Sequence, residues 1–374
     1  MQFSDSETQR LLRDTTRSYL ADRFASERLY PLHHGESPLT DEELTGFAEL
    51  GWFGLLVAES EGGGGVSLLN AAVVIEEFGY AAVPAPVMMG NIAAALLANV
   101  VASDALRSHL SGLAGGKRLY TICEGPRRRG RPSEPAAPPL TLTGGKLSGT
   151  LPLVSFADVC HFVVTPLIVD GEPAFGLLAL AGARLQRQEL LDRPNYFSVH
   201  FEETAFDGSV VLATGERADE LHERCDALVT ALSLIELSGM MQRILEMTTT
   251  FVTNRVQFGQ PIAKFQAVRH RAAELLMQTE TTRWAAYHAL WRFQEDPADT
   301  QEIWLAKQWA VRAADRIYQT SHLLHGGVGV AIDYPLHLYT QGVAAFAVRG
   351  GTMNEMVDRT VERMKSRLGA EMSA

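Results

Sequence analysis

The stretch RVQFGQPIAKFQ at residues 255–266 places a cation, a glycine, a proline and a glutamine in one turn. The guanidinium of Arg255 offers a planar fork of donors that suits pyrophosphate oxygens, and the amide of Gln266 can pair with a base or ribose edge. Apolar residues recur at helical spacing on both sides, and Gly259 and Pro261 interrupt them, so we expect Arg255 at a helix end. The turn therefore predicts a phosphate-binding corner. The alternative is an ordinary helix hairpin in which Arg255 is a surface charge.

Segments of different periodicity must position this turn. The apolar spacing is helical up to about residue 115, has period two to about residue 215, and is helical again afterwards. Short β-rich runs separated by Gly, Pro and Asp predict antiparallel strands, at 160–164, 175–180 and 197–201. We therefore expect a helical domain, a small β domain and a second helical domain, at 1–116, 117–215 and 216–374.

The composition of the 374 residues bounds the class of protein. Apolar residues make up 46% of the chain, enough for a large core, and the net charge of −11 argues against nucleic acid and anionic membranes as partners. The first twenty residues are amphipathic and charged, and no uninterrupted apolar run approaches membrane-spanning length, so we expect a soluble, cytoplasmic protein. Three widely spaced cysteines predict neither a disulfide framework nor a metal site.

Three motifs carry a resemblance to a known family. The turn at 255–266 resembles the R-x-x-F-G-x-P-I-x-x-F-Q signature of the flavin-dependent acyl-CoA dehydrogenases. The segment GWFGLLVAESEGGGGVSLLNAAVVIEEFG at 51–79 is similar to the family's first-domain segment, and LHGGVGVAIDYPLHLY at 324–339 to its G-G-x-G segment. The resemblance implies an α+β fold with an N-terminal helical domain, a central antiparallel β domain and a C-terminal four-helix-bundle domain.

The resemblance also implies a cofactor and its binding residues. Family members desaturate an acyl-CoA thioester between Cα and Cβ with FAD, which bridges two subunits, and pass electrons to an electron-transfer flavoprotein or a similar acceptor. The residues that match positions given to the neighbour's FAD are Arg255, Phe258, Gln266, Gly326, Gly327 and Gly329. Thr352, which matches the threonine of the family's Y-E-G-T segment, is a further expected cofactor-binding residue. His325 lies beside these glycines and either contacts the cofactor or caps a helix.

The part of the site that each subunit keeps for itself is altered. Family members hold the flavin ring with T-E-P-x-x-G-S and W-[IV]-[ST] segments, of which only Glu124 and Ser155 survive here, beside a basic run at 127–131. The glutamate of the family's Y-E-G-T segment is replaced by Gly350, and a second family position for this base falls at about Val229. Neither replacement can accept a proton.

These matches and losses support one interpretation and leave two alternatives. The interpretation is a non-catalytic subunit of an α2β2 acyl-CoA dehydrogenase, resembling the actinobacterial enzymes that act on sterol or other bulky CoA thioesters, with a paralogous partner that supplies the base. The first alternative is a self-sufficient homotetramer whose base is Asp226 or Glu236, both on the helix before Arg255. The second is a flavin-free scaffold that kept the fold and lost the chemistry.

Overall fold

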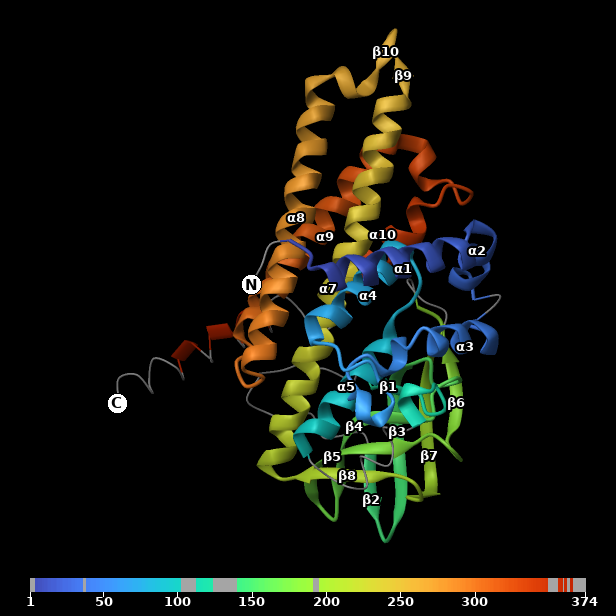
Figure 1. Cartoon of the computed structure of the whole chain (residues 1–374), viewed down its shortest axis with the longest axis vertical. Helices are drawn as coiled ribbons and strands as arrows, with labels where there is room; N and C mark the ends of the chain where they lie inside the picture. The colour runs from blue at the N-terminus through green and yellow to red at the C-terminus, as the bar shows by residue number, and fades with distance from the viewer. Residues whose placement is uncertain are drawn as a thin grey trace. The chain divides into compact units, whose positions relative to one another are not determined.

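The computed structural model describes residues 4–35, 38–101, 112–123, 140–190, 195–348, 356–358, 360–361 and 364–365 (Figure 1). Helices come first along the chain, strands follow, and helices return from Glu216 onward. This order confirms the predicted fold class.

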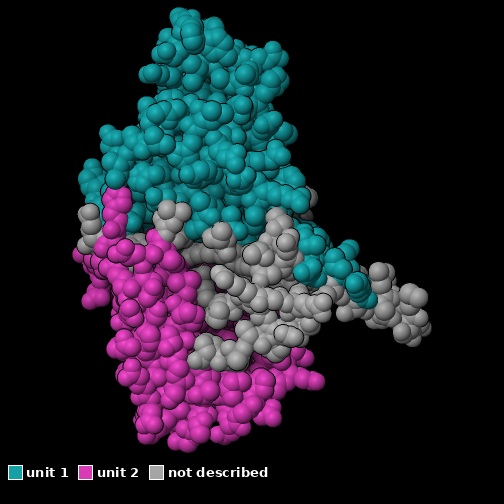
Figure 2. Space-filling model, turned by 180° about the vertical axis from the view of Figure 1, so that it is seen from behind, with its two compact units in different colours: residues 1–33, 72–83, 230–374 teal, residues 34–71, 84–229 magenta. Residues whose placement is uncertain are grey.

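The chain folds into two compact units, each built from separated stretches (Figure 2). Unit 1 contains Met1–His33, Ala72–Val83 and Thr230–Ala374. Unit 2 contains His34–Ala71 and Pro84–Val229. The predicted division at 1–116, 117–215 and 216–374 follows changes of secondary structure along the chain, and it stays a prediction.

An eight-stranded sheet forms the core of unit 2. Its strands are β1 Tyr120–Ile122, β2 Leu140–Thr143, β3 Lys146–Ser155, β4 Phe162–Val169, β5 Glu172–Ala179, β6 Arg184–Gln188, β7 Tyr196–Ala205 and β8 Val210–Thr214. The order is β6-β7-β3-β2-β4-β5-β8, with β1 also paired to β4. Most pairs are antiparallel as predicted, but β1 and β2 both pair with β4 in parallel. The sheet is therefore mixed, because the connections into β4 return the chain in the same direction.

Unit 2 also contains helices, one of which packs against this sheet. They are α3 Asp41–Glu49, the short 3-10 turns η1 Trp52–Gly54 and η2 Glu59–Glu61, and α5 Pro86–Val101. Helix α5 lies directly against β1, since a Cβ added at Gly90 would come within 2.1 Å of the Tyr120 carbonyl oxygen. The Asn91 side-chain oxygen accepts a hydrogen bond from the Tyr120 backbone N–H at 2.9 Å. A glycine and a buried amide thus join α5 to the sheet.

Unit 1 is helical. Its helices are α1 Glu7–Arg23, α2 Ser26–His33, most of α4 Leu68–Tyr80, the second part of α7 Glu216–Asn254, α8 Gln266–Glu295, α9 Gln301–His325 and α10 Leu336–Val348. A capping box begins α1, in which the Ser6 hydroxyl accepts from the Gln9 backbone N–H and the Gln9 side chain accepts from Ser6 N–H. The cap satisfies donors that a helix start otherwise leaves open.

Helices α4 and α7 cross at very short range through two glycines. A Cβ added at Gly79 would lie 1.9 Å from the Glu236 carbonyl oxygen, and one added at Gly239 would lie 2.0 Å from that of Glu76. Each helix therefore has a glycine at the point where the backbone of the other helix passes. The crossing brings Glu76 into the interior of unit 1, where it is almost fully buried.

Helix α7 passes a simple test for a membrane span. Among the residues that the structure describes, it alone is long and apolar enough by length and composition, and 78% of its most apolar stretch is buried inside the protein. A core helix of a folded protein passes the same test, so this finding is weak evidence for a membrane.

Candidate functional site

The predicted phosphate-binding turn is a small β-hairpin between two helices. Helix α7 ends at Asn254, earlier than the expected stop at Gly259, and two short strands follow, β9 Val256–Gln257 and β10 Gln260–Pro261. Phe258 and Gly259 form the turn with φ of 53° and 76°. Two successive positive φ values match the right-handed twist of a two-residue hairpin. The hairpin, and not a helix breaker, reverses the chain here (Figure 1).

Arg255 lies exposed at the base of this hairpin. Its backbone N–H donates to the Phe251 carbonyl at 2.8 Å, and its carbonyl accepts from Ile262 N–H at 2.8 Å. Within the described part of the chain, its guanidinium makes no hydrogen bond or ion pair. A fixed backbone with an unpaired cation leaves the donors of Arg255 open to a group from outside this unit.

Phe258 is exposed to an unusual degree. It is 90% exposed and touches Phe265 edge-on, with ring centroids 6.0 Å apart. An aromatic residue with positive φ carries backbone strain of about 1–2 kcal/mol, which folding of this unit alone does not explain. Gln266 is the first residue of α8 and is exposed, as predicted for the other polar group of the turn.

The three predicted glycines of the G-G-x-G segment have different structural roles. Gly326 ends α9 with φ 60° and ψ −141°, a conformation open essentially to glycine alone. Gly329 is required by packing, because an added Cβ would lie 2.9 Å from the His325 Cβ. An added Cβ at Gly327 would meet nothing within 4 Å. Only at Gly327 does the fold of this unit leave the choice of glycine unexplained.

A cluster of rings brings the two motifs together. Phe251, one turn before Arg255, lies against His325, directly before Gly326, with ring centroids 4.6 Å apart. His325 is buried, and its Nδ1 lies 2.8 Å from the Ser321 carbonyl oxygen, which can only accept. Nδ1 therefore carries the hydrogen of the neutral ring. Burial lowers the pKa of His325, which favours that neutral form.

The neutral tautomer of His325 sets the orientation of a neighbouring phenol. The His325 Nε2 lies 3.0 Å from the Tyr334 hydroxyl, and as the unprotonated nitrogen it accepts the Tyr334 hydrogen. His325 is thus a buried positioning residue, closer to the predicted helix-end role than to a direct ligand contact.

A groove of about 500 Å³ lies beside this cluster in unit 1. Its lining residues are Arg243, Glu246, Met247, Thr250, Phe251, Asn254, Arg255, Tyr334 and Pro335. Among the predicted cofactor residues that the structure describes, only Arg255 belongs to this lining; Phe258, Gln266 and the three glycines lie outside it. The groove combines two cations and one carboxylate with an apolar wall.

Glu246 is held on both of its oxygens. The Tyr80 hydroxyl donates to Oε2 at 2.5 Å, and the Gln242 amide donates to Oε1 at 2.9 Å. Arg243 is more loosely paired, with Nη1 3.6 Å from Oε2. The guanidinium of Arg17 lies over the Tyr80 ring, 4.1 Å from its centroid. The carboxylate in the groove is therefore fixed from behind.

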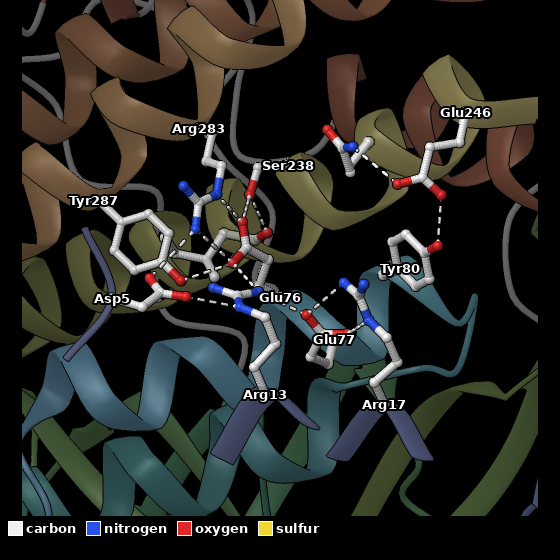
Figure 3. A network of polar contacts seen from close by, with 12 residues as sticks. Asp5, Arg13, Arg17, Glu76, Glu77, Tyr80, Ser238, Glu246, Arg283 and Tyr287 are labelled. Atoms are coloured by element: carbon white, nitrogen blue, oxygen red, sulfur yellow. Dashed lines mark hydrogen bonds and ion pairs between the residues drawn. The ribbon is translucent and has the colours of Figure 1, made fainter. Parts of the chain in front are cut away.

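A second concentration of charge lies inside unit 1 (Figure 3). Glu76 accepts from Arg283 Nε at 2.6 Å and from the Tyr287 hydroxyl at 2.9 Å, and it pairs with Arg13 at 2.8 Å. Glu77 pairs with Arg13 at 2.6 Å and with Arg17 at 2.7 Å. We name Asp5, Arg13, Arg17, Glu76, Glu77 and Arg283 the ion cluster.

The ion cluster is electrically balanced, with three guanidinium groups and three carboxylates. Burial would raise the pKa of Glu76, but Arg283 and Arg13 outweigh burial and hold that pKa below its ordinary value. The cluster joins α1, α4 and α8, and each of its members has a partner of opposite charge within it. We interpret it as a structural core element and not as a catalytic site.

The candidate bases are separated by the fold. Asp226 is half-buried on the part of α7 that belongs to unit 2, beside the buried thiol of Cys225, whose pKa burial and Asp226 raise to about 12. Glu236 is 4% exposed in unit 1, at the crossing with α4. Gly350, Thr352, Glu124 and the basic run at 127–131 lie outside the described residues.

The surviving flavin-ring position Ser155 is part of the core of unit 2. It is buried, and its carbonyl accepts from the Thr121 hydroxyl at 2.7 Å. In the described part of the chain, no group of three or more His, Cys, Asp or Glu side chains could hold a metal ion. Cys123, Cys160 and Cys225 are buried free thiols.

Sequence comparisons identify the family. The acyl-CoA dehydrogenase N-terminal domain model matches residues 6–117, and the C-terminal domain model matches residues 230–365. The chain belongs to the acyl-CoA dehydrogenase family. The acyl-CoA dehydrogenase FadE28 of Mycobacterium tuberculosis is similar at 27% identity, over 76% of this chain and 81% of that protein.

Solved structures of this family share the fold. The ChsE4-ChsE5 complex from Mycobacterium tuberculosis contains a chain with a TM-score of 0.83 at 24% identity, covering 98% of this chain and 99% of that one. A chain of a variant of the Tcur3481-Tcur3483 steroid ACAD has a TM-score of 0.85 at 22% identity, covering 97% of this chain and 99% of that one. The acyl-CoA dehydrogenase resemblance read from the sequence is confirmed.

Sequence reasoning missed most of the groove. Arg243 and Glu246 stand three residues apart on α7, so their spacing could have indicated one helical face, but nothing in the sequence connects them to Tyr80. Tyr334 lies within the segment quoted for the resemblance, yet its contact with His325 depends on the turn after Gly326. The contact of Glu246 with Tyr80 and that of Tyr334 with His325 can be recognised only in the folded structure.

Members of the acyl-CoA dehydrogenase family typically bind FAD, and one end of such a site fits this chain. The unpaired guanidinium of Arg255 has the donor geometry that pyrophosphate oxygens need. The segments that match the flavin-ring positions are altered in sequence or lie outside the described residues. The fit therefore concerns the phosphate end of the cofactor.

Proposed function

We propose that this chain is a subunit of an FAD-dependent acyl-CoA dehydrogenase that completes the FAD site of a paralogous catalytic subunit. The observation that carries this proposal is the unpaired, exposed guanidinium of Arg255 beside a strained and exposed Phe258. The backbone of Phe258 is strained, and the guanidinium of Arg255 has no partner among the described residues. Both are explained if a second subunit covers the hairpin.

The residues of this chain would bind and orient the cofactor from the neighbouring side. Arg255 would hold pyrophosphate oxygens, Gln266 would pair with a ribose or base edge, and Gly327 would let the backbone approach closely. Phe258 would pack into the partner. When bound, FAD supplies the acceptor for the hydride that leaves Cβ of the acyl-CoA.

The proton acceptor would come from the partner. The two family positions for the base hold Val229 and Gly350 in this chain, and neither side chain can take a proton. Asp226 and Glu236 are the candidate bases of the self-sufficient alternative, and this proposal gives neither a role in the reaction.

The names of similar solved structures support a heteromeric assembly. The ChsE4-ChsE5 complex and the Tcur3481-Tcur3483 steroid ACAD each combine the names of two different proteins. We propose by analogy an α2β2 assembly acting on a sterol or other bulky CoA thioester. An electron-transfer flavoprotein or similar acceptor, and a cytoplasmic location, stay predictions.

The test is the visible absorption spectrum and solution mass of the chain, alone and after coexpression with its nearest paralogue. We expect a colourless chain alone and one flavin per pair of chains in the complex. The Arg255→Ala variant should lose flavin from the complex, while the control Arg10→Ala, at an exposed arginine of α1, should keep it.

Other outcomes distinguish the alternatives. One flavin per chain in the protein alone would overturn the proposal and make Asp226→Asn and Glu236→Gln the next variants to assay for lost activity. A complex that forms without flavin, and is unaffected by Arg255→Ala, would indicate a flavin-free scaffold.

A further inference from the structure

We infer that Glu246 makes the groove beside Arg255 selective for an anion that carries hydroxyl or amino donors next to its charge, as a nucleotide does, over a bare polyphosphate. The inference rests on the proposed function in one respect, namely that Arg255 receives phosphate oxygens. It adds a specificity-determining residue outside the R-x-x-F-G and G-G-x-G motifs.

The first step is the fixed position of the Glu246 carboxylate. Tyr80 and Gln242 each use one oxygen, at 2.5 and 2.9 Å, so the side chain cannot turn away from the groove that it lines. An ionised carboxylate only accepts hydrogen bonds, and each oxygen has further lone pairs to offer. Glu246 therefore presents acceptors and negative charge to whatever enters.

Tyr334, which also lines the groove, adds a second acceptor. Its hydrogen is given to His325 Nε2, because His325 Nδ1 already donates to the Ser321 carbonyl. The phenolic oxygen that lines the groove therefore has lone pairs but no hydrogen to offer. Two fixed acceptors favour a ligand with donors of its own.

The two arginines of the groove attract the negative charge of the ligand. Among the described residues Arg255 has no side-chain partner. Arg243 contacts the Tyr80 and Tyr339 side chains, but it reaches a carboxylate, that of Glu246, only at 3.6 Å. Met247, Phe251 and Pro335 form an apolar wall, and the volume of about 500 Å³ is in the range of small-molecule sites. A phosphate at the arginines, hydroxyls at Glu246 and Tyr334, and a flat ring on the apolar wall would satisfy every group.

A bare polyphosphate would satisfy only the arginines. It offers acceptors and negative charge, so its oxygens would face the Glu246 carboxylate without a proton between them. Selectivity therefore comes from repulsion of the wrong anion as well as attraction of the right one.

The experiment measures binding of ADP and of inorganic pyrophosphate to the purified full chain by titration calorimetry near pH 7.5. The wild type should bind ADP more tightly than pyrophosphate. Glu246→Gln, which keeps the shape and removes the charge, should reduce the ratio of the two affinities about tenfold, a typical value for one charged hydrogen bond. Arg255→Ala should weaken both ligands together.

Two further variants separate a binding role from a structural one. Tyr80→Phe frees one Glu246 oxygen and should change the ratio in the same direction by less. Glu274→Gln, at an exposed glutamate of α8, should leave both affinities unchanged. Urea unfolding of each variant reports whether the fold itself has changed.

The inference is overturned if the wild type binds pyrophosphate as tightly as ADP, if it binds neither, or if Glu246→Gln changes both affinities equally. Its failure is separable from that of the proposed function. Selective ADP binding by a chain that never completes a flavin site would keep the inference and reject the function. Flavin in the complex without ADP selectivity would do the reverse.

Discussion

Three arginines lie in the ion cluster around Glu76, and two line the groove that ends at Arg255. In the ion cluster Arg13, Arg17 and Arg283 face carboxylates at 2.6–2.8 Å. In the groove Arg243 reaches a carboxylate only at 3.6 Å, and Arg255 has no side-chain partner among the described residues. The same residue type therefore serves two purposes.

The difference shows how charge can indicate function in this fold. A buried charge must be paired inside the protein, because an unpaired one costs several kcal/mol. An exposed charge costs little without a partner, so an unpaired arginine in a concave surface is available for a ligand. Pairing, and not the presence of charge, separates the structural cluster from the candidate site.

The largest expected effect comes from breaking the ion cluster. Glu76→Ala should lower the free energy of unfolding by about 3–5 kcal/mol, because the half-buried Arg283 would keep only Asp5, at 3.8 Å, and Arg13 would lose one of its carboxylates. Urea denaturation measures the change. Glu274→Ala on the exposed face of α8 should stay within about 0.5 kcal/mol of the wild type. A loss below about 1 kcal/mol for Glu76→Ala would mean that the cluster does not hold the fold.

The glycine crossing gives the next largest effect. Gly239→Ala places a Cβ 2.0 Å from the Glu76 carbonyl oxygen, so α4 and α7 must move apart, at a cost of about 1–3 kcal/mol. Helix propensity alone predicts a gain of about 1 kcal/mol. Gly342→Ala on α10 is the matched control, since its Cβ would meet the flexible Met240 Sδ at 2.8 Å. Equal melting temperatures for the two variants would contradict the tight crossing.

Acid should weaken the ion cluster through protonation of Glu76. The pKa of Glu76 in the folded protein is below its ordinary value of 4.5, so its contribution is complete above pH 4.5 and is lost as pH falls through the folded pKa. The slope for one group approaches about 1.4 kcal/mol per pH unit. Urea unfolding at a series of pH values should show a shallower slope below pH 4.5 in Glu76→Gln than in the wild type. Identical slopes would assign acid sensitivity to other carboxylates.

The smallest expected effect concerns Phe258, in the exposed hairpin beside Arg255. Phe258→Asn should stabilise the isolated chain by about 0.5–1 kcal/mol, because asparagine tolerates positive φ better than a bulky side chain. Gln257→Asn, in the neighbouring strand, should give no such gain. The same Phe258→Asn variant should reduce the yield of complex on coexpression with the paralogue. Full assembly by this variant would argue against Phe258 as a partner contact.

Much of the fold was predictable because the spacing of apolar residues along the chain indicates helices and strands locally. The change from helical to alternating spacing near residue 117 and back near 216 predicted the order of elements, and the motif at 255–266 predicted the position of Arg255. The parallel pairing of β1 and β2 with β4 was not predictable in the same way. Strand direction within a sheet depends on long connections, which periodicity does not report.

The candidate site was only partly predictable for a similar reason. Arg255 and Gln266 stood out because one motif contains both residues. The ion cluster joins Glu76 to Arg283, and the groove joins Tyr80 to Glu246, across 207 and 166 residues of sequence. No motif spans such a distance. The hairpin that follows the end of α7 at Asn254 was not predicted, because its turn needs a positive φ at Phe258, which that residue type does not favour.

The ion cluster has a consequence for the order in which the chain matures during synthesis. Arg13 and Glu76 leave the ribosome early, but Arg283 follows Glu76 only after another 207 residues. Until then, Glu76 lacks one of the cations that permit its burial, and unit 1 cannot close. A nascent chain truncated before α8 would therefore keep Glu76 hydrated, and premature release would yield a substrate for quality-control proteases.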